Sequence, residues 1–354
     1  MKKAIVVCSH PFSGWSMVKF SEMVRSVVAI DPQIVCYIPP NHLSKIIKSK
    51  RIRSFAIYLE KKVYSSLHLF FLYKFYKPEK ILLCDHSDTF LVSLIPKNKL
   101  IVVCHDLFAI QAMEGLIKDI PQSFRVKLEL KINFYALKRA SRLIVDSNTM
   151  QNQVLQMIPN AVTSVISPTV IPIKQVSCKP LVQVRYCLLP MNYHWRKNRL
   201  LGLKIYSKIL ESFRQELFLV IVGNSLSDEE NTFIGSKSLE PNILHFSNLD
   251  EDQMRNLYKF CEFVLFMSKF EGFGLPIIEA NFHSRLVVHS DLPVLNEVAG
   301  GKNISIGENL EEIDWKKTSQ TVLNAKSRKQ ANLHFESNYS FDIFKSKLLN
   351  LLNR

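Results

Sequence analysis

Short runs of apolar residues recur along the chain and alternate with longer segments in which apolar positions repeat every three or four residues. The runs are rich in Val, Ile and Leu and lack polar alternation, which is typical of strands buried on both faces of a parallel sheet. The longer segments predict amphipathic helices. The predicted strands are 4–8, 34–38, 80–84, 100–104, 143–146, 186–189, 217–222, 243–246, 263–266 and 286–289. The predicted helices include 18–28, 55–76, 125–139, 200–212, 250–261, 276–282 and 341–353.

The strand–helix alternation restarts in the second half of the chain. Pro168, Pro172 and Pro180 lie in a stretch of poor periodicity, which predicts a linker near 168–182. A chain of 354 residues is also long enough for about two domains. We therefore predict two doubly wound α/β domains, residues 1–172 and 173–335, with a C-terminal helical segment at 336–354 that packs back toward the first domain. Ligands in such sheets bind outside the carboxyl ends of the strands, and with two domains the cleft between them is the expected site.

Composition restricts the class of protein. Hydrophobic residues make up 47% and charged residues 22%, as in an ordinary globular chain with a large core. The longest apolar stretches fall short of the roughly 20 residues that span a bilayer, and the apolar run at 4–8 is too short for a signal peptide. We therefore expect a cytoplasmic protein. The seven cysteines contain no C-x-x-C pair and are expected to be reduced.

Positive charge is concentrated in the first half of the chain. Residues 1–175 hold 24 Lys and Arg against 11 Asp and Glu, a net charge of +13, whereas residues 176–354 hold 22 against 20, a net charge of +2. A basic half implies an anionic partner, such as nucleic acid, a phosphorylated substrate or an anionic membrane surface.

The segment 270–280, which follows a predicted buried strand, carries the clearest candidate chemistry. Gly272 and Gly274 allow the backbone to turn tightly and approach a ligand, and Pro276 suits the first turn of a helix. A helix N-terminus binds phosphate through its free N–H groups. The carboxylates Glu271 and Glu279 suit neutral hydroxyl groups instead. The same residues also fit a plain strand–turn–helix connection with two solvated glutamates.

This segment resembles the Glu-x7-Glu signature of family 4 retaining glycosyltransferases, which have the GT-B architecture of two Rossmann-like domains. Residues 243–249 and 286–301 are similar to the sequences that flank the signature in that family. Residues 188–198 resemble the strand–loop–Lys-Asn element that opens its donor domain. In the first half, residues 101–106 resemble a strand ending in His-Asp, and residues 142–148 a strand followed by Ser. Ser147 equally fits a cap of the next helix.

The resemblance implies transfer of a sugar, with retention, from a nucleotide-sugar donor to a glycan acceptor, and hence an enzyme of the hexosyltransferase type. The family works without a bound metal, so no cofactor is expected. The implied catalytic residues are Glu271, His105 and Lys197. The implied donor-binding residues are Arg196, Lys197, Asn198, Gly272, Phe273, Gly274, Leu275 and Glu279. The residues assigned to the acceptor side or to a membrane are Gly14, Lys48, Lys50, Arg51 and Arg53.

The sequence departs from the family in two places. The first loop has the single glycine Gly14 where the family has a glycine pair, and Met191-Asn192 stands where the family has Gly-Arg or Gly-Thr. Arg196 is the candidate replacement for that donor-phosphate arginine. The acidic run Asp250-Glu251-Asp252 opens a predicted helix, where acidic residues favour the helix dipole, so it is interpreted as a helix start rather than a metal site.

The basic first half is then expected to serve the acceptor. Seven basic residues precede the aromatic-rich segment 64–76, a pattern that suits an anionic membrane surface. These residues are Lys45, Lys48, Lys50, Arg51, Arg53, Lys61 and Lys62. We therefore expect peripheral binding to the inner face of the cytoplasmic membrane, a polyprenyl-diphosphate-linked acceptor, and a role in the synthesis of surface polysaccharide such as O-antigen, capsule or lipopolysaccharide. An ordinary core helix with a solvated basic flank explains the same pattern.

Other classes of protein remain open at this point. A basic protein that binds nucleic acid or an acidic glycan would share the charge, but no nucleic-acid recognition motif is present and no nucleic-acid partner is expected. A non-transferase GT-B enzyme, such as a sugar-nucleotide epimerase or a phosphorylase, would share the fold. A catalytically inactive homologue would not need both glutamates and Lys197.

Overall fold

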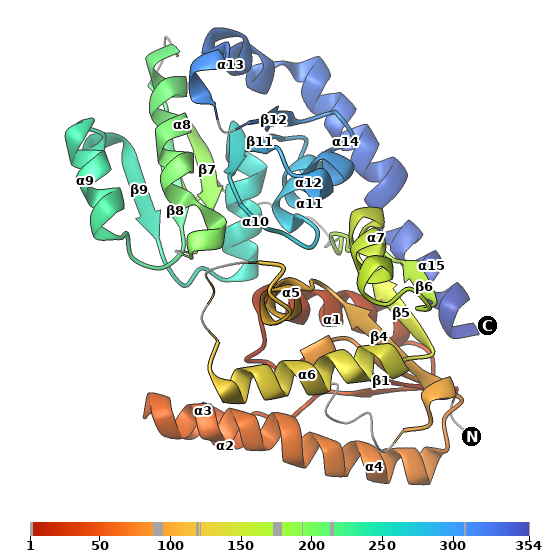
Figure 1. The fold of residues 1–354 in the computed structure, drawn as a ribbon. Helices are drawn as coiled ribbons and strands as arrows, with labels where there is room; N and C mark the ends of the chain where they lie inside the picture. The colour runs from red at the N-terminus through yellow and green to blue at the C-terminus, as the bar shows by residue number, and fades with distance from the viewer. Residues whose placement is uncertain are drawn as a thin grey trace. The chain divides into compact units, whose positions relative to one another are not determined.

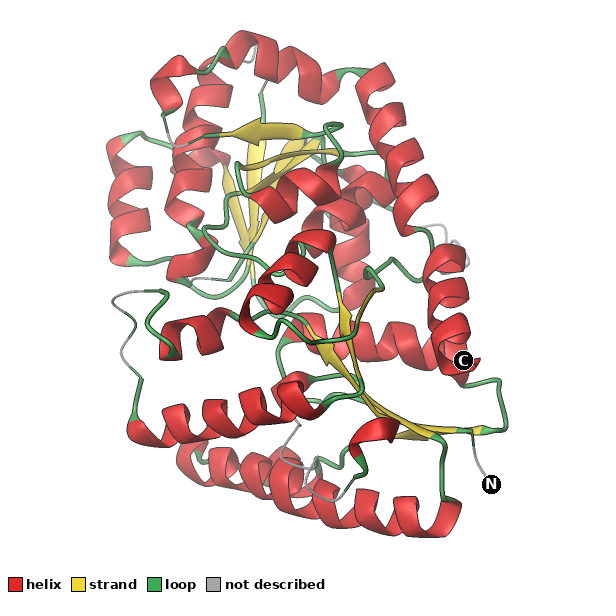
Figure 2. Cartoon of the chain, turned by 45° about the vertical axis from the view of Figure 1, so that its right-hand side comes forward, coloured by secondary structure: helices red, strands yellow, loops and turns green. Residues whose placement is uncertain are grey.

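The computed structural model describes residues 3–87, 95–117, 120, 122–172, 179–192, 194–212, 216–307 and 309–353, without the side chains of Lys50 and Arg51. The chain forms two compact units. Met1–Pro168 and Asp342–Arg354 make up the first, and Thr169–Phe341 makes up the second. Each unit is built on a parallel sheet with flanking helices (Figure 1, Figure 2). From the sequence we predicted the boundary after residue 172, where the structure has it after Pro168. We predicted a final segment at 336–354, of which Asp342–Arg354 belongs to the first unit.

In the first unit, the described strands form one parallel sheet in the order β2-β1-β3-β4-β5-β6. Their bounds are β1 (Ala4–Val7), β2 (Ile34–Tyr37), β3 (Lys80–Leu83), β4 (Leu100–Cys104), β5 (Arg142–Val145) and β6 (Thr163–Val165). The helices of this unit are α1 (Trp15–Val28), α2 (His42–Ile46), α3 (Lys50–Tyr58), the π-helical turn η1 (Leu59–Tyr64), α4 (Ser65–Tyr76), α5 (Phe108–Met113), α6 (Phe124–Arg139), α7 (Asn148–Met157) and α15 (Phe341–Asn353), with a short 3₁₀ turn at Lys97–Lys99.

In the second unit, the described strands form a parallel sheet in the order β12-β11-β10-β7-β8-β9. Their bounds are β7 (Tyr186–Pro190), β8 (Phe218–Val222), β9 (Ile243–Phe246), β10 (Phe263–Phe266), β11 (Leu286–Ser290) and β12 (Ile304–Ile306). The helices are α8 (Arg199–Ser212), α9 (Asp228–Ser236), α10 (Glu251–Phe260), α11 (Leu275–Phe282), α12 (Pro293–Ala299), α13 (Trp315–Leu323) and α14 (Ala325–Tyr339), with 3₁₀ turns at Trp195–Lys197, Glu240–Asn242 and Leu310–Glu312.

The predicted strands are all present, and the central ones are buried along their whole length. All four residues of β10 are buried, because helices cover both faces of the sheet. Two short edge strands, β6 and β12, were not predicted from the sequence. The helix predicted at 55–76 begins earlier, at Lys50, and contains the turn η1.

Helix starts follow the capping residues that the sequence indicates. Ser147 Oγ accepts a hydrogen bond from the Met150 N–H at the start of α7, which confirms the capping interpretation of this serine. Asp250 caps α10 and forms a reciprocal capping box with Gln253, so the acidic run opens a helix as predicted. The six cysteines in the described residues are free. No helix in the described part of the chain has the length and apolar character needed to cross a membrane.

The C-terminal helix α15 belongs to the first unit (Figure 1), where its Asn353 accepts a hydrogen bond from the Lys3 ammonium. Phe344 meets Phe20 of α1 edge-on, with 5.7 Å between ring centroids. Lys80 Nζ donates to the carbonyl oxygens of Leu351 and Leu352 at 3.0 and 3.3 Å, which satisfies carbonyls left open at the end of a helix.

The strand order fixes where each sheet can bind a ligand. The order reverses between β1 and β3 in the first sheet and between β7 and β10 in the second. At such a switch point the loops leaving the two strands diverge to opposite faces and leave a crevice at the carboxyl ends. The loops after β1 and β3, and those after β7 and β10, are therefore the places to look for chemistry.

Candidate functional site

In the second unit, the loops that follow β7 and β10 carry the residues singled out from the sequence. The two strands are paired through Leu188 and Val264, so both loops leave the same edge of the sheet. The Lys269 N–H donates to the Arg196 carbonyl at 2.6 Å and ties one loop to the other. This edge is the switch point of the second sheet.

A lysine and a glutamate meet across these loops. Lys197 Nζ lies 2.5 Å from Glu271 Oε1. The ammonium also lies 5.6 Å from the centroid of the Phe266 ring, which is close enough for a cation–π contact. Both polar side chains are partly exposed at the sheet edge, at 29% for Lys197 and 15% for Glu271. The Lys197 ammonium is therefore paired with a carboxylate and still partly accessible to solvent.

Lys197 is positioned by a single 3₁₀ turn, Trp195–Lys197, that precedes α8. His194 Nδ1 accepts from the Arg196 N–H at the start of this turn, at 3.3 Å. Asn198 ends it in the left-handed region, with φ 50°, where Asn is more readily tolerated than most residues. The turn and its cap contain Arg196, Lys197 and Asn198, three residues assigned to donor binding from the sequence.

The helix α11 begins at the same edge. Gly274 is its N-cap, with φ 119°, and a Cβ there would lie 2.8 Å from Leu295 Cδ2, so both conformation and space require glycine. Pro276 lies in the first turn. The first N–H groups of a helix have no partner within it and carry partial positive charge. They point toward the edge that Lys197 occupies.

Not all the predicted donor residues present their side chains. Phe273 is buried, and its ring meets Tyr339 edge-on at 5.8 Å, so only its backbone is available to a ligand. Leu275 packs against the hydrophobic core. These two residues, with Gly272, therefore position backbone at the start of α11.

Glu279 lies one turn into α11 and is partly exposed. The buried Tyr258 hydroxyl on α10 donates a hydrogen bond to its carboxylate. Burial, and then this neighbouring carboxylate, raise the pKa of Tyr258 well above its usual range. Tyr258 thus stays a neutral donor that orients Glu279.

Arg199 is a structural residue of this edge that sequence reasoning missed. It is almost completely buried and forms a bidentate pair with Glu230, with Nε–Oε1 at 2.7 Å and Nη2–Oε2 at 2.6 Å. Its guanidinium also donates to the carbonyls of Asn224 and Ser225 at 2.9 and 2.8 Å. The sequence pattern Ser227-x-x-Glu230 predicts a capping box at the start of α9 and so could have located Glu230, the partner of Arg199. Arg199 therefore fixes the loops after β7 and β8 together.

Gly223 shows how closely those loops approach. It directly follows β8, and a Cβ at this position would lie 2.7 Å from the Met191 carbonyl oxygen. The neighbouring Asn192 side chain accepts from the Asn224 N–H at 3.1 Å. Met191 and Asn192, which depart from the family pattern, therefore hold the loop after β7 against the loop after β8.

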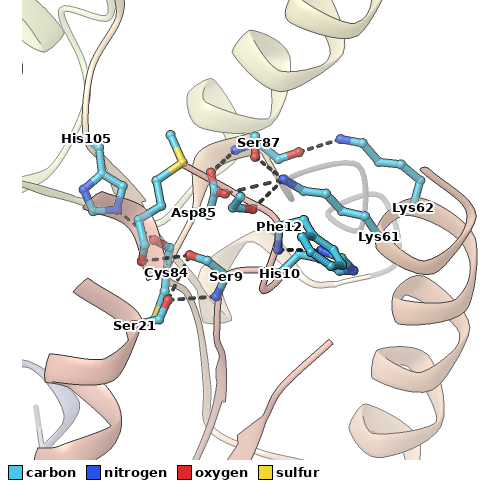
Figure 3. Close-up of polar contacts among 12 residues, drawn as sticks. Ser9, His10, Phe12, Ser21, Lys61, Lys62, Cys84, Asp85, Ser87 and His105 are labelled. Carbon is cyan, nitrogen blue, oxygen red and sulfur yellow. Dashed lines mark hydrogen bonds and ion pairs between the residues drawn. The ribbon is translucent and has the colours of Figure 1, made fainter. Parts of the chain in front are cut away.

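In the first unit, a polar cluster occupies the switch point between β1 and β3 (Figure 3). Lys61 reaches into it from η1 and donates to Ser13 Oγ at 3.0 Å and to Ser87 Oγ at 2.7 Å. Its ammonium lies 3.5 Å from Asp85 Oδ2. Although burial works against the charged carboxylate, Lys61 leads the groups that hold the pKa of Asp85 below its usual range. The cluster was not predicted from the sequence, because its members lie far apart along the chain.

The positions of Lys61 and Lys62 show that part of the predicted basic surface was wrong. Lys62 Nζ donates to the Ser87 carbonyl at 2.6 Å and pairs with Glu129 on α6 at 2.9 Å, and its side chain is only 5% exposed. A π-helical turn contains an extra residue per turn, and η1 presents Glu60, Lys61 and Lys62 inward. These two lysines were expected at a membrane surface and instead hold the carboxyl edge of the first sheet.

His105 directly follows β4 and uses both ring nitrogens inside the protein. Nδ1 donates to Asp146 Oδ2 and Nε2 donates to the Cys84 carbonyl, both at 2.9 Å. Burial disfavours the imidazolium, but the ion pair and hydrogen bond with Asp146 outweigh it and raise the pKa of His105 to about 9. The histidine is buried. In this geometry His105 joins the segments that follow β3, β4 and β5, and its catalytic role stays a prediction from the sequence.

His10, in the loop after β1, is a neutral imidazole, unlike the protonated His105. Its Nδ1 accepts from the Phe12 N–H at 3.2 Å, and its Nε2 donates to the Pro40 carbonyl at 3.1 Å. Burial, followed by the charge of Lys61, lowers the pKa of His10. A neutral imidazole is thus fixed beside the loop that contains Gly14.

The remaining acceptor-side residues lie on the first unit. Gly14 is the N-cap of α1 at φ −57°, and a Cβ there would make only an ordinary contact with Met17. Lys48 is exposed, and the Arg53 guanidinium lies 4.7 Å from the Phe12 ring centroid. The side chains of Lys50 and Arg51 lie outside the described residues.

Comparisons with known proteins agree with this geometry. Residues 187–333 match the family model of glycosyl transferases group 1, and this segment contains Lys197, Glu271 and Glu279. Among curated proteins, no relative matches the sequence.

Solved structures resemble the whole chain in fold. A mutant of S. aureus TarM, in complex with fondaparinux, alpha-GlcNAc-glycerol and UDP, has a TM-score of 0.60 at 16% identity over 77% of this chain and 55% of its own. Sucrose-phosphate synthase from Thermosynechococcus elongatus has a TM-score of 0.72 at 13% identity, covering 99% of this chain and 98% of its own. WaaG, a glycosyltransferase involved in lipopolysaccharide biosynthesis, has a TM-score of 0.69 at 11% identity, covering 99% of both. The two parallel-sheet units and these neighbours give the chain a GT-B fold, as predicted.

Proposed function

We propose that this protein is a retaining glycosyltransferase of family 4 that moves a hexose from a nucleotide sugar to a glycan acceptor. The observation that carries the proposal is the Lys197–Glu271 pair beside the Gly274-capped start of α11, at the switch point of the second sheet. It places a cation, a row of backbone N–H groups and two carboxylates at one edge. A nucleotide diphosphate sugar requires contacts of these kinds.

The diphosphate is assigned to Lys197, Arg196 and the N–H groups at the start of α11. As the bond from the anomeric carbon to the diphosphate breaks, negative charge grows on the leaving oxygen. Donors already fixed around that oxygen stabilise the transition state more than the ground state. Lys197 is freed for this task when the donor displaces Glu271 from its ammonium. We propose that the reaction proceeds without a resident metal, since the ammonium and helix terminus supply the neutralising charge.

The two carboxylates are assigned to hydroxyl groups. Glu279, oriented by Tyr258, accepts hydrogen bonds from the ribose. Glu271, once released from Lys197, accepts from hydroxyls of the transferred sugar. TarM, whose fold is similar, binds UDP, which supports a uridine nucleotide as the first donor to test.

Acceptor binding is assigned to the first unit. The surface of α3, α4 and α6 exposes large apolar side chains, including Phe71 at 66%, Phe75 at 80% and Phe124 at 83%. Basic residues flank them, among them Lys48 and Lys74. Arg125 on α6 lies 4.9 Å from the Tyr58 ring of α3, and α3 continues through η1 into α4, so these exposed side chains belong to adjoining helices. Apolar side chains ringed by cations suit the interface of an anionic bilayer.

This face supports a peripheral location on the inner side of the cytoplasmic membrane and an acceptor linked to polyprenyl diphosphate. The similarity in fold to WaaG supports a role in the synthesis of surface polysaccharide such as lipopolysaccharide, capsule or O-antigen.

The test starts with thermal-shift measurements of UDP-, GDP-, dTDP- and CMP-sugars on the wild type and on Lys197→Ala. The sugar that stabilises the wild type but not the variant is then offered with a lipid-linked glycan, and the anomeric configuration of the product is read by NMR. Stabilisation by none of the donors would reject the proposal. An inverted product would leave a glycosyltransferase but remove the family 4 assignment.

A further inference from the structure

A cavity lies in the first unit, at the opposite edge of the sheet from the polar cluster of Figure 3. Its volume is about 480 Å³, within the range of small-molecule sites. It opens where β3 and β5 begin, at Lys80 and Arg142, and α15 forms its other wall. Because it lies at the amino ends of the strands, it is separate from both switch points. The lining residues are Lys80, Asn98, Ile101, Ser141, Arg142, Ser164, Val165, Ile166, Lys347, Asn350 and Leu351.

Three of the lining side chains are cationic, and none of the lining residues is acidic. Lys80, Arg142 and Lys347 form no ion pair with a carboxylate among the described residues. Lys347, Asn350 and Leu351 recur at i, i+3 and i+4 on α15, so one face of the helix carries them all. Three unpaired cations around one cavity repel one another, and an anion would relieve that repulsion.

The hydrogen bonds within the cavity leave donors free. Lys80 uses two of its three N–H groups on the carbonyls of Leu351 and Leu352. Within the described part of the chain, the Arg142 guanidinium makes one hydrogen bond, from Nη1 to Ser164 Oγ at 2.9 Å. The Ser164 hydroxyl accepts there and keeps its own hydrogen to donate. Capping of α15 thus explains Lys80, but it explains neither Arg142 nor Lys347.

The lowered pKa of Lys80 agrees with an excess of positive charge around the cavity. Burial lowers the pKa of Lys80, and the nearby charges of Lys3 and Arg142 lower it further, while Glu79 acts in the opposite direction. The ammonium is thus held in surroundings that disfavour its charge. Added negative charge in the cavity would stabilise it.

We propose that this cavity binds a small organic phosphate, with the phosphate dianion held by Arg142, Lys80 and Lys347. A dianion with three acceptor oxygens matches three cations and the hydroxyl of Ser164. The volume exceeds that of phosphate alone, and Ile101 and Val165 offer apolar contact to an organic part. The ligand would bridge α15 and the strands of the sheet. The site is independent of the proposed glycosyl transfer.

The test is isothermal titration calorimetry of the full chain with glucose 1-phosphate, UMP and inorganic phosphate. We expect saturable binding of at least one organic phosphate, tighter than that of inorganic phosphate, and the two organic arms distinguish a sugar from a nucleoside. Lys347→Glu, at an exposed position, and Arg142→Gln should each weaken binding about tenfold or more. Lys345→Glu, on the same helix but outside the cavity, should not.

A donor-site variant separates the two sites. Lys197→Ala should leave binding of glucose 1-phosphate at the cavity unchanged, because Lys197 belongs to the second unit, and any UMP binding that only this variant loses is assigned to the proposed donor site. The proposal is overturned if none of the three phosphates binds. It is equally overturned if Lys347→Glu and Arg142→Gln bind like the wild type, or if Lys197→Ala abolishes the binding. Inorganic phosphate binding as tightly as both organic ligands would reject the organic part of the proposal.

Discussion

Lys197 Nζ lies 2.5 Å from Glu271 Oε1, joining two loops that leave neighbouring parallel strands. The ion pair closes over the position proposed for the diphosphate, so without a ligand the protein keeps this cation neutralised by one of its own carboxylates. Donor binding must exchange one anion for another. The exchange costs less than desolvating a free ammonium, because the charge on Lys197 is paired both before and after it.

Replacing Lys197 should therefore impair catalysis more than folding. Lys197→Ala is expected to lower kcat/KM at least ~10²-fold, the scale for losing one preorganised contact to developing charge. Lys197→Arg should recover only part of the activity, because the planar guanidinium cannot occupy the site of a compact ammonium. Steady-state kinetics with the donor that gives the largest thermal shift measure both effects. Lys204→Ala, exposed on α8, is the matched control, and wild-type activity in Lys197→Ala would remove the assignment.

Glu279 should act mainly on donor affinity. Glu279→Ala is expected to raise the donor KM about tenfold or more, with a smaller change in kcat, because a hydrogen bond to a charged group is worth about 1.5–3 kcal/mol. Tyr258→Phe, which removes only the hydroxyl that orients this carboxylate, should have a weaker effect of the same kind. Unchanged donor binding in folded Glu279→Ala, measured by calorimetry, would contradict the ribose contact.

The His105–Asp146 pair predicts a pH-dependent stability. Because its folded pKa is about 9, above the ordinary value of 6.5, His105 contributes stability that is complete below about pH 6.5 and is lost as the pH rises through about 9. Asp146→Asn should lower the free energy of unfolding by about 3 kcal/mol near pH 6, since it leaves a buried histidine without its counter-ion.

The measurement is urea unfolding of wild type and Asp146→Asn at several pH values. The difference between them should shrink from pH 6.5 to pH 9.5. A difference independent of pH across this window would mean that His105 is not the titrating group.

Arg199 and Glu230 should show strong coupling. Because both side chains are buried, replacing either one alone with Leu leaves an unpaired buried charge and is expected to destabilise the protein by about 3–5 kcal/mol. The double variant should recover much of that loss, and a double-mutant cycle from unfolding curves gives the coupling free energy. Additive effects of the two single changes would show that the pair does not act as a unit.

The strands could be predicted from the sequence because buried parallel strands are continuous apolar runs. The strands β6 and β12 escaped prediction because each has only three residues, of which none in β6 and one in β12 is buried, too few for a pattern. The first turn of α3 escaped for another reason. Its residues Lys50–Arg53 are mostly basic, so apolar periodicity does not begin until Phe55.

Much of the candidate site at the switch point of the second sheet could be predicted from a local motif, since Gly274, Glu271 and Glu279 lie within nine residues. The polar cluster of the first unit could not be predicted in this way. Ser13, Lys61 and Ser87 come from three separate elements and meet only because the sheet order places β1 beside β3. Lys61 and Lys62 were assigned to the surface because sequence alone does not reveal a π-helical turn. Arg199 was missed because an isolated arginine in an amphipathic helix is usually solvated.

The apolar and basic face of α3, α4 and α6 predicts reversible binding to anionic membranes. Each surface Lys or Arg contributes about 1 kcal/mol near an anionic leaflet. With Lys61 and Lys62 turned inward, five of the seven basic residues expected at a membrane from the sequence remain candidates: Lys45, Lys48, Lys50, Arg51 and Arg53. We expect co-sedimentation with anionic vesicles at low salt and release at high salt, because screening shortens the reach of these charges.

Changing Lys48, Lys50, Arg51 and Arg53 to Glu should abolish this binding while donor hydrolysis continues. Phe71→Ser with Phe75→Ser should weaken it without removing its salt dependence, because these rings supply apolar rather than electrostatic contact. Lys316→Glu with Lys317→Glu, on α13 of the second unit, is the charge-matched control and should bind like the wild type. If the wild type ignores anionic vesicles even at low salt, the face serves a different anion, and binding to a soluble acidic glycan becomes the measurement that decides its partner.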